Sequence, residues 1–450
     1  MAYDASRAPA AAANAPAEMS LLDSLAFAAM VVLPTIAKGV LIRRPLAVKL
    51  AAALDLDRRA VRHMQRLRAS YGEAPLFIRN PLRRQFVVLL AADDVRAVLE
   101  GAPDPFTPAS DEKQSALSHF EPHMALVTRG AERAERRAFS DEVLQSQAPM
   151  HALAGRFASV AAEQCRGLVA QAKTQDALCW PDFIAAWMTL VRRVVLGDAA
   201  RDDHGVTDLL GRLRGNGNWA FMRRRDTALR ARLHRRLADY LAAAEPGSLA
   251  ALAAAARKSE AAAPSHQMAQ WLFAFDAGGI ASFRTLALLA SHPAAMARVR
   301  EEIAGAGEAA DLPFLRACFI ESVRLWPTTP AVLRQATRAA QLGGVALPAE
   351  TGVLIFAPFF HRDDARLEFA DRFAPELWLH RDPGARLPLI PFSAGPAICP
   401  GRHLVALVAS LMLMCLLKRD VSLPDPPLGP DRPLPGLLDH YALRFRLGAT

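Results

Sequence analysis

One cysteine, Cys399, stands in a short loop bounded by glycines. Gly395 precedes it by four residues, Gly401 follows it by two, and an apolar segment rich in leucine comes next. This pattern predicts a helix that begins near Pro400, because proline suits the first helical position. The N–H groups and dipole of a helix N-terminus favour a thiolate. A thiolate can be the axial ligand of haem iron, so Cys399 is a candidate metal ligand.

The other cysteines have no comparable setting. None stands in a glycine-bounded loop, and none forms a Cys-x-x-Cys pair. We expect them to be small buried hydrophobic residues, and a chain without a cysteine framework favours a reducing compartment. They are Cys165, Cys179, Cys318 and Cys415.

Arginines and one glutamate form further candidates. Glu321 and Arg324 are three residues apart on a predicted helix that ends before Pro327, so they share a face and can pair. Arg334 follows, and its planar guanidinium suits a carboxylate partner. Two arginines four residues apart on another predicted helix form either a solvated face or a carboxylate site; they are Arg133 and Arg137.

Three segments resemble motifs of the cytochrome P-450 family, and their order along the chain and the spacing between them also resemble that family. Residues 392–401 resemble its Phe-x-x-Gly-x-Arg-x-Cys-x-Gly loop, residues 321–324 its Glu-x-x-Arg helix, and residues 373–378 its Phe-x-Pro-Glu-Arg-Phe/Trp segment. Ala397 and Leu377 stand where the family has arginine, and Arg372 is a candidate substitute for the second. The resemblance implies haem b, a structural Glu321–Arg324 pair and iron ligation by Cys399. It also implies haem contacts from Arg133, Arg137, Gly278, Arg334, Phe392, Gly395 and Gly401.

A long apolar helix is predicted over residues 266–291, between Pro264 and Pro293. Twenty-six residues span roughly 39 Å, enough to cross the molecule. Gly278 and Gly279 lie in its middle, where each costs about 1 kcal/mol relative to alanine. We therefore expect close approach of a ligand there.

The sequence of the same helix differs from that of the resembled family at the positions where the family's members activate dioxygen. An acid and an alcohol normally deliver protons there, but this chain has Ile280 and Ala281. Ser282 is the preferred substitute relay and Thr285 a second candidate. The alternative for Ser282 is a hydrogen bond to a backbone carbonyl one turn back. Asp276 is expected to pair with a basic group.

The 450 residues show no internal linker. The resemblance implies a mainly α fold: one domain over residues 21–450 with a small β region, and haem buried between two long helices. Residues 1–20, rich in alanine and proline, are expected to be a disordered tail. β signals are confined to residues 74–90, 341–357 and 441–447.

The composition of the chain limits which binding partners and which cellular location we expect. The net charge is +9, but the basic residues are dispersed, so nucleic acid is not expected. The apolar run at residues 24–37 is shorter than the roughly 20 residues of a membrane span, and acidic residues precede it. We expect no transmembrane span and a cytoplasmic location, with a surface-lying helix as the alternative.

The resemblance implies a haem-thiolate monooxygenase of the soluble bacterial type. It would insert one atom of O2 into an apolar small molecule, a fatty acid first and a terpenoid second, with electrons from a ferredoxin or flavoprotein. Loops at residues 106–128 and 212–225 would shape the pocket. The missing acid and alcohol leave two alternatives open, a peroxide-driven peroxygenase and a non-catalytic haem-thiolate binding or sensing protein. Basic residues around the helix after Cys399 would steer an acidic electron donor; they are Arg402, His403, Lys418 and Arg419.

Overall fold

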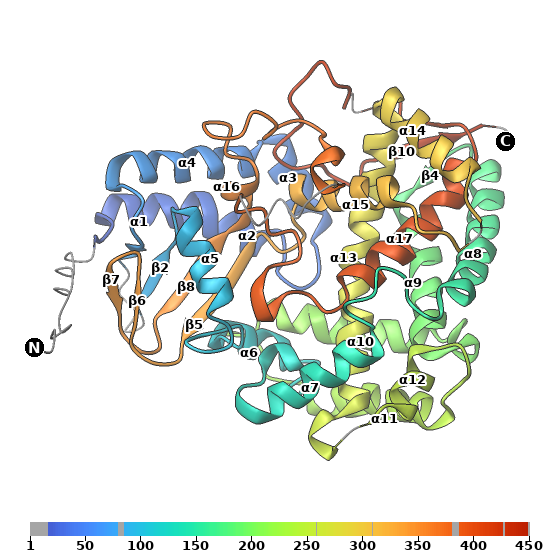
Figure 1. The fold of residues 1–450 in the computed structure, drawn as a ribbon, viewed down its shortest axis with the longest axis horizontal. Helices are drawn as coiled ribbons and strands as arrows, with labels where there is room; N and C mark the ends of the chain where they lie inside the picture. The colour runs from blue at the N-terminus through green and yellow to red at the C-terminus, as the bar shows by residue number, and fades with distance from the viewer. Residues whose placement is uncertain are drawn as a thin grey trace, which may run out of the picture.

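The computed structural model describes residues 17–79, 85–257, 259–307, 309–379, 387–425 and 428–448. Most strands and the N-terminal helices lie on one side of the molecule, and the longest helices lie on the other, together with a small sheet that contains the C-terminal strand (Figure 1). The expected mainly α fold with a small β region is confirmed.

The α-helices follow the apolar periodicity and proline boundaries of the sequence. They are α1 (Leu21–Phe27), α2 (Leu33–Ala37), α3 (Pro45–Ala53), α4 (Leu56–Tyr71), α5 (Ala92–Glu100), α6 (Asp111–Leu117), α7 (Gly130–Val143), α8 (Ala154–Gln175), α9 (Trp180–Leu196), α10 (His204–Gly217), α11 (Thr227–Ala243), α12 (Leu249–Ala255), α13 (Pro264–Ser291), α14 (Pro293–Ala304), α15 (Pro313–Leu325), α16 (Ala357–His361) and α17 (Arg402–Leu417).

The strands form three small sheets. A five-stranded sheet has the order β1-β2-β8-β5-β3, a three-stranded sheet the order β4-β10-β9, and β6 pairs with β7. β2 and β8 are parallel, whereas β5 and β8 are antiparallel and place Arg334 opposite Val353. The strands are β1 (Leu76–Phe77), β2 (Phe86–Val88), β3 (Phe106–Thr107), β4 (Leu178–Cys179), β5 (Ala331–Ala336), β6 (Ala340–Leu342), β7 (Val345–Leu347), β8 (Gly352–Phe356), β9 (Val421–Ser422) and β10 (Arg444–Leu447).

Helix α13 is the centre of the helical side. It packs against α9, α15 and α17, and its middle is buried. Within the described residues, the stretch Glu260–Ser291 is the one helix long and apolar enough to cross a membrane, but 78% of its apolar window is buried in the protein. That burial identifies it as the core helix of this fold.

Local details differ from the sequence-based expectations. β5, which carries Arg334, was not among the expected β segments. Of the expected disordered tail, residues 1–16 lie outside the described part, but Met19 is buried and its N–H donates to the Phe77 carbonyl.

Cys165 of α8 and Cys415 of α17 form a disulfide, so the expectation of four unpaired small residues is wrong for these two. Their positions are 250 residues apart, and only helix packing brings them together.

Candidate functional site

The Cys399 loop is held in shape by its backbone. The Cys399 N–H donates to the Phe392 carbonyl at 3.0 Å. Gly395 has a φ of +64°, and a Cβ atom there would lie 2.2 Å from the Leu99 carbonyl oxygen at the end of α5. Only glycine fits both the left-handed conformation and this close approach. The loop is therefore anchored against α5 before it enters α17.

Cys399 lies just before α17, whose N-cap residue is Gly401. Burial raises the pKa of the Cys399 thiol above its ordinary value. A backbone hydrogen bond from Gly401 and the charges of Arg137 and Arg402 act in the opposite direction but are outweighed. The Gly401 N–H at the helix terminus favours the thiolate, as expected, but the desolvation of the buried sulfur outweighs this contribution. A bound metal ion would deprotonate the thiol outright.

Two buried arginines face the same region without acidic partners. Arg334 is 3% exposed and Arg133 is 7% exposed. The Nε atom of each has no hydrogen-bond partner among the described residues, and no described carboxylate forms an ion pair with either. Burial, together with the charge of Arg133, lowers the pKa of Arg334 to about 10. Two unmatched buried guanidinium groups indicate a site for an anionic ligand.

A third cation lies beside Arg334. The ammonium of Lys113, from α6, donates to the Leu333 carbonyl at 3.0 Å. Burial and the charge of Arg334 hold the pKa of Lys113 well below its usual range. No sequence pattern indicated a role for Lys113, because one lysine on a short polar helix is an ordinary surface feature.

Arg137 is engaged by the protein itself. Its Nε donates to Asp141 at 2.8 Å and its Nη1 to the Ile398 carbonyl at 2.8 Å. The side chain therefore braces the residue that precedes Cys399. Of the two candidate arginines, Arg133 and Arg137, Arg133 is the one whose Nε atom has no hydrogen-bond partner among the described residues.

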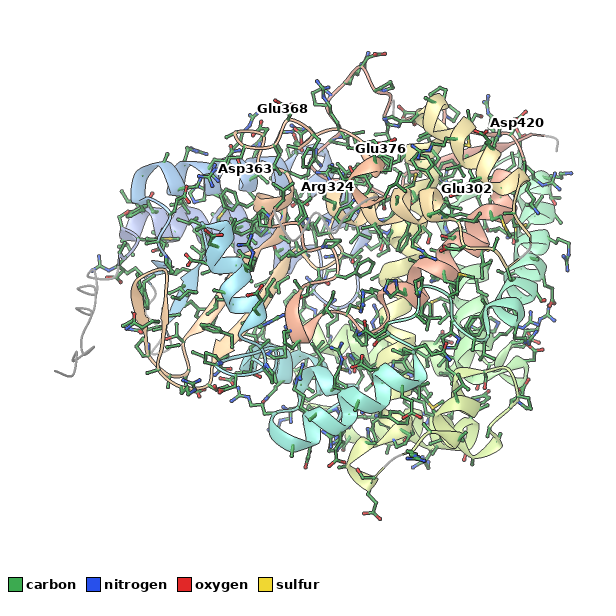
Figure 2. The ribbon with its side chains drawn as sticks, viewed as in Figure 1. Glu302, Arg324, Asp363, Glu368, Glu376 and Asp420 are labelled. Atoms are coloured by element: carbon green, nitrogen blue, oxygen red, sulfur yellow. A yellow bond between two sulfur atoms is a disulfide. The ribbon has the colours of Figure 1, made fainter. Side chains whose placement is uncertain are left out.

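Glu321 and Arg324 form a completely buried pair on α15, with contacts of 2.6 and 2.8 Å. Arg324 of this pair is labelled in Figure 2. Arg324 also donates to the carbonyls of His361, Ala370 and Arg372. Arg372 thus contributes its backbone and not its side chain, so its proposed substitution for the missing arginine is wrong. The Trp378 indole and the Ala374 N–H donate to Glu321 instead, each at 2.9 Å.

The paired glycines of α13 accommodate protein side chains. A Cβ atom on Gly278 would lie 2.4 Å from the Val405 side chain of α17, and one on Gly279 would lie 2.8 Å from the Trp187 ring of α9. Trp187 also donates its indole N–H to the Phe275 carbonyl at 2.8 Å. Helix packing therefore accounts for both glycines, and close approach of a ligand is not required to explain them.

The hydroxyl groups near Ile280 and Ala281 are committed to the backbone. Ser282 donates to the Gly278 carbonyl at 2.7 Å, and Thr285 donates to the Ala281 carbonyl at 2.8 Å. Both residues are fully buried. Asp276 pairs with Arg214 at 2.6 Å, as expected. A proton-relay role for Ser282 or Thr285 stays a prediction.

The loops expected to shape a pocket divide into two kinds. In the first loop Phe106, His119 and Phe120 are buried, and Phe120 packs against Phe273 with ring centroids 5.3 Å apart. The segment after α10 is instead exposed, and Phe221 and Met222 are each 73% exposed. The first loop is therefore largely core, whereas the second forms an apolar surface.

The side chains of this site fit a bound haem. Cys399 supplies a sulfur ligand at the end of an anchored loop, and the orphaned Nε atoms of Arg133 and Arg334 would bind the two carboxylates of the cofactor. Phe392, Gly395 and Gly401 shape the loop around the sulfur.

Comparison with known proteins agrees with this fit. The family model "Cytochrome P450" matches residues 275–431. A retinoic acid-bound cyanobacterial CYP120A1 structure has a TM-score of 0.67 at 17% identity, covering 86% of this chain and 94% of that one. Cytochrome P450 CYP102L1 has a TM-score of 0.69 at 16% identity, covering 91% and 97%. These two likenesses establish the fold over most of the chain.

Sequence relatives match a smaller part. Cytochrome P450 93G1 of Oryza sativa subsp. japonica is 35% identical over 150 residues, 29% of each chain. The mitochondrial 1,25-dihydroxyvitamin D(3) 24-hydroxylase of Mus musculus is 33% identical over 113 residues, 24% of this chain and 21% of the relative. The matched part thus spans less than a third of these relatives.

Proposed function

We propose that this chain is a cytochrome P450, a haem-thiolate monooxygenase of soluble bacterial type, which inserts one atom of O2 into an apolar small molecule; the family model that matches residues 275–431 supports this. One observation carries the proposal. The single sulfur at the end of an anchored loop, Cys399, occurs together with two buried guanidinium groups, Arg133 and Arg334, that lack acidic partners. A dianionic cofactor that also needs a sulfur ligand matches this donor set.

The residues have separate roles in this proposal. The bound haem supplies the O–O cleavage chemistry that thiolate ligation favours. Arg334 and Arg133 hold its carboxylates and orient it, and Arg137 braces the loop through Ile398. Ile280 and Ala281 are buried and apolar, so they exclude water from the middle of α13 without moving a proton.

We propose an apolar substrate, a fatty acid first and a terpenoid second. The buried Ile280 and Ala281 favour an apolar ligand near α13. The CYP120A1 neighbour holds retinoic acid, an apolar carboxylate, and the mouse relative is named for a vitamin D derivative. Titration with a panel of fatty acids and terpenoids, followed by the shift of the Soret band, tests this part. A panel without any shift would contradict it.

We propose that electrons come from a separate acidic protein, either a ferredoxin or a flavoprotein. Arg166, Lys173, Lys418 and Arg419 line a groove between α8 and the end of α17. Such a basic surface favours an acidic partner, and its effect should fall as salt rises. A cytoplasmic location stays a prediction.

A peroxide-driven peroxygenase is the second candidate. The hydroxyls of Ser282 and Thr285 both donate to backbone carbonyls, which favours an oxidant that already carries its protons and electrons. Turnover with NAD(P)H and redox proteins, compared with turnover on peroxide alone, separates the two. Tight substrate binding without product under either condition would favour a binding or sensing role.

The spectrum of the reduced CO complex tests the central assignment. We expect the red-shifted Soret band of thiolate-ligated haem, and we expect Cys399→Ser to lose it. Cys179→Ser is the matched control, because Cys179 is a free, partly buried cysteine whose sulfur contacts Asp182. A normal band in Cys399→Ser would overturn the assignment.

A further inference from the structure

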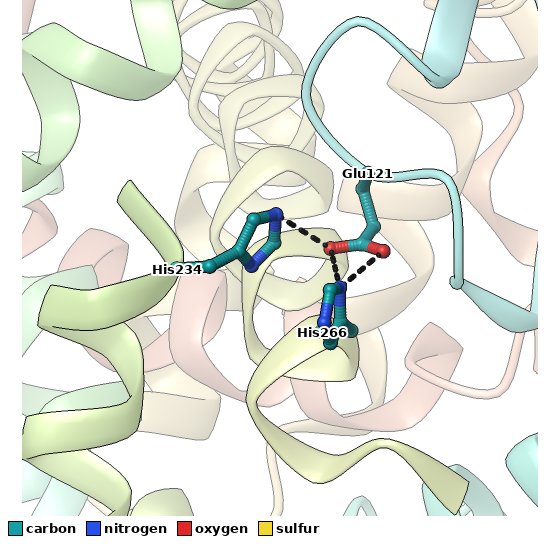
Figure 3. A group of neighbouring side chains, drawn as sticks. All are labelled: Glu121, His234 and His266. Atoms are coloured by element: carbon teal, nitrogen blue, oxygen red, sulfur yellow. Dashed lines mark hydrogen bonds and ion pairs between the residues drawn. The ribbon is translucent and has the colours of Figure 1, made fainter. Parts of the chain in front are cut away.

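Glu121, His234 and His266 converge from three separate elements (Figure 3). Glu121 lies in the segment after α6, His234 on α11, and His266 in the first turn of α13. The Glu121 carboxylate is completely buried, and both histidines are partly buried. None of the three belongs to the Cys399 site, and the sequence motifs gave no sign of them.

The three side chains direct their donor atoms at one another. His266 Nδ1 lies 2.9 and 3.0 Å from the two oxygens of Glu121, and His234 Nε2 lies 3.2 Å from Oε2. His234 Nε2 also lies 2.9 Å from the Phe120 carbonyl oxygen, a contact that it would exchange for the metal. The two imidazole rings stack, with centroids 4.2 Å apart. One donor atom from each residue lies within 4.8 Å of the others.

We propose that these residues bind a divalent transition metal ion, with Zn²⁺ as the best match. Two imidazole nitrogens and one carboxylate oxygen form a ligand set that zinc uses in proteins. Zinc bonds to such atoms are about 2.0–2.2 Å long, which places tetrahedral ligands roughly 3.4 Å apart. The N–O distances of 2.9 and 3.2 Å therefore need little adjustment.

The charge balance supports a cation at this point. No described arginine or lysine forms an ion pair with Glu121. Arg230 lies nearby but donates to the Ser118 carbonyl, and Arg136 pairs with Glu132. A buried carboxylate beside two imidazoles is costly without a compensating charge, and a metal ion would supply it.

Three protein ligands leave room for a fourth. The His123 ring meets the His266 ring edge-on, with centroids 4.9 Å apart, and the backbone N–H of His123 donates to Glu121 Oε1 at 2.7 Å. His123 or water would complete a tetrahedral site.

The metal would act as a clamp and not in catalysis. His266 precedes Ala281 by fifteen residues, roughly 22 Å along the helix. The ion would fix the segment between α6 and α7 to α11 and α13. Because α7 carries Arg133, the clamp would also steady one wall of the cofactor site. This inference does not depend on the proposed oxygenase activity.

Calorimetric titration of the haem-loaded, chelator-dialysed protein with ZnCl2 tests the clamp. We expect one tight Zn²⁺ site per chain. Glu121→Gln, His234→Gln and His266→Gln should each weaken binding by roughly 100-fold or more, since even outer-shell changes cost 10–100-fold. His204→Gln is the matched control, because His204 is exposed at the start of α10. No tight binding by the natural protein, or unchanged binding in all three variants, would overturn the proposal.

A second measurement avoids the variants, in case they fail to fold. X-ray absorption at the zinc edge of the natural, zinc-loaded protein should show only nitrogen and oxygen ligands, with imidazole scattering at about 2.0–2.1 Å. Sulfur scattering at about 2.3 Å would place the ion on a cysteine and overturn the assignment.

Discussion

The indole N–H of Trp378 donates to Oε2 of Glu321 at 2.9 Å, inside the protein. The same carboxylate accepts two bonds from Arg324 and one from the Ala374 N–H. Leu377, adjacent to Trp378, stands where the resembled family carries an arginine. A neutral indole and a backbone amide therefore complete the hydrogen bonding of the buried carboxylate, and among the described residues only Arg324 forms an ion pair with it.

Trp378→Phe should destabilise the protein. Phenylalanine preserves most of the packing but leaves Glu321 short of one donor to a buried charge, which costs roughly 1.5–3 kcal/mol. Chemical denaturation monitored by circular dichroism measures the change. Trp219→Phe, at a 39% exposed position, should have a much smaller effect. Equal stability of Trp378→Phe and the natural protein would show that the indole bond is dispensable.

Arg334→Gln should weaken haem retention. The substitution removes a buried guanidinium whose Nε has no partner among the described residues, and the lost charged hydrogen bond is worth roughly 1.5–3 kcal/mol. Haem transfer to an apo-acceptor protein, followed by absorbance, gives the rate of loss. Arg96→Gln is a suitable control, because Arg96 pairs only with the exposed Asp93. Unchanged haem loss would remove Arg334 from the cofactor site.

Ala281→Thr should raise the coupling of NAD(P)H consumption to product, because it restores a hydroxyl where the family carries one. Ser282→Ala should lower coupling if Ser282 is the proton relay, and should leave coupling unchanged if its hydroxyl serves only the Gly278 carbonyl to which it donates. Product formed per NAD(P)H consumed is the readout, and substrate affinity should move little. A large loss of coupling in Ser282→Ala, with normal folding, would instead identify Ser282 as the relay.

Asp94 should make stability depend on pH. Burial, with smaller contributions from Asp93 and Glu73, raises the pKa of Asp94 from 3.8 to about 6. The folded state therefore binds this proton more tightly than the unfolded state, so its contribution to stability increases as the pH falls from about 6 to 4. At pH 7 the buried charge costs on the order of 3 kcal/mol, because one pKa unit corresponds to about 1.4 kcal/mol. Asp94→Asn should raise Tm at pH 7 and reduce the increase in Tm that follows acidification. The control Asp431→Asn, at an exposed position, should change neither quantity.

The sequence by itself determined the elements whose signals are local. The proline-bounded apolar segment at 266–291 specified α13, because helical periodicity and caps depend on neighbouring residues. The pairing of residues 321 and 324 could be predicted, because residues that are three positions apart on a helix lie on the same face. Cys399 stood out through its glycines, and Gly395 is indeed required by a positive φ.

Tertiary structure decided every relationship between distant residues. Trp187 and Val405 come from other helices to fill the space over Gly278 and Gly279, and no local pattern specifies which side chain arrives there. Cys165 and Cys415 likewise meet only through the packing of α8 on α17. Glu121, His234 and His266 are ordinary residues along the chain. They become a candidate metal site only because three elements place their donor atoms together, and such convergence depends on long-range packing that sequence spacing does not encode.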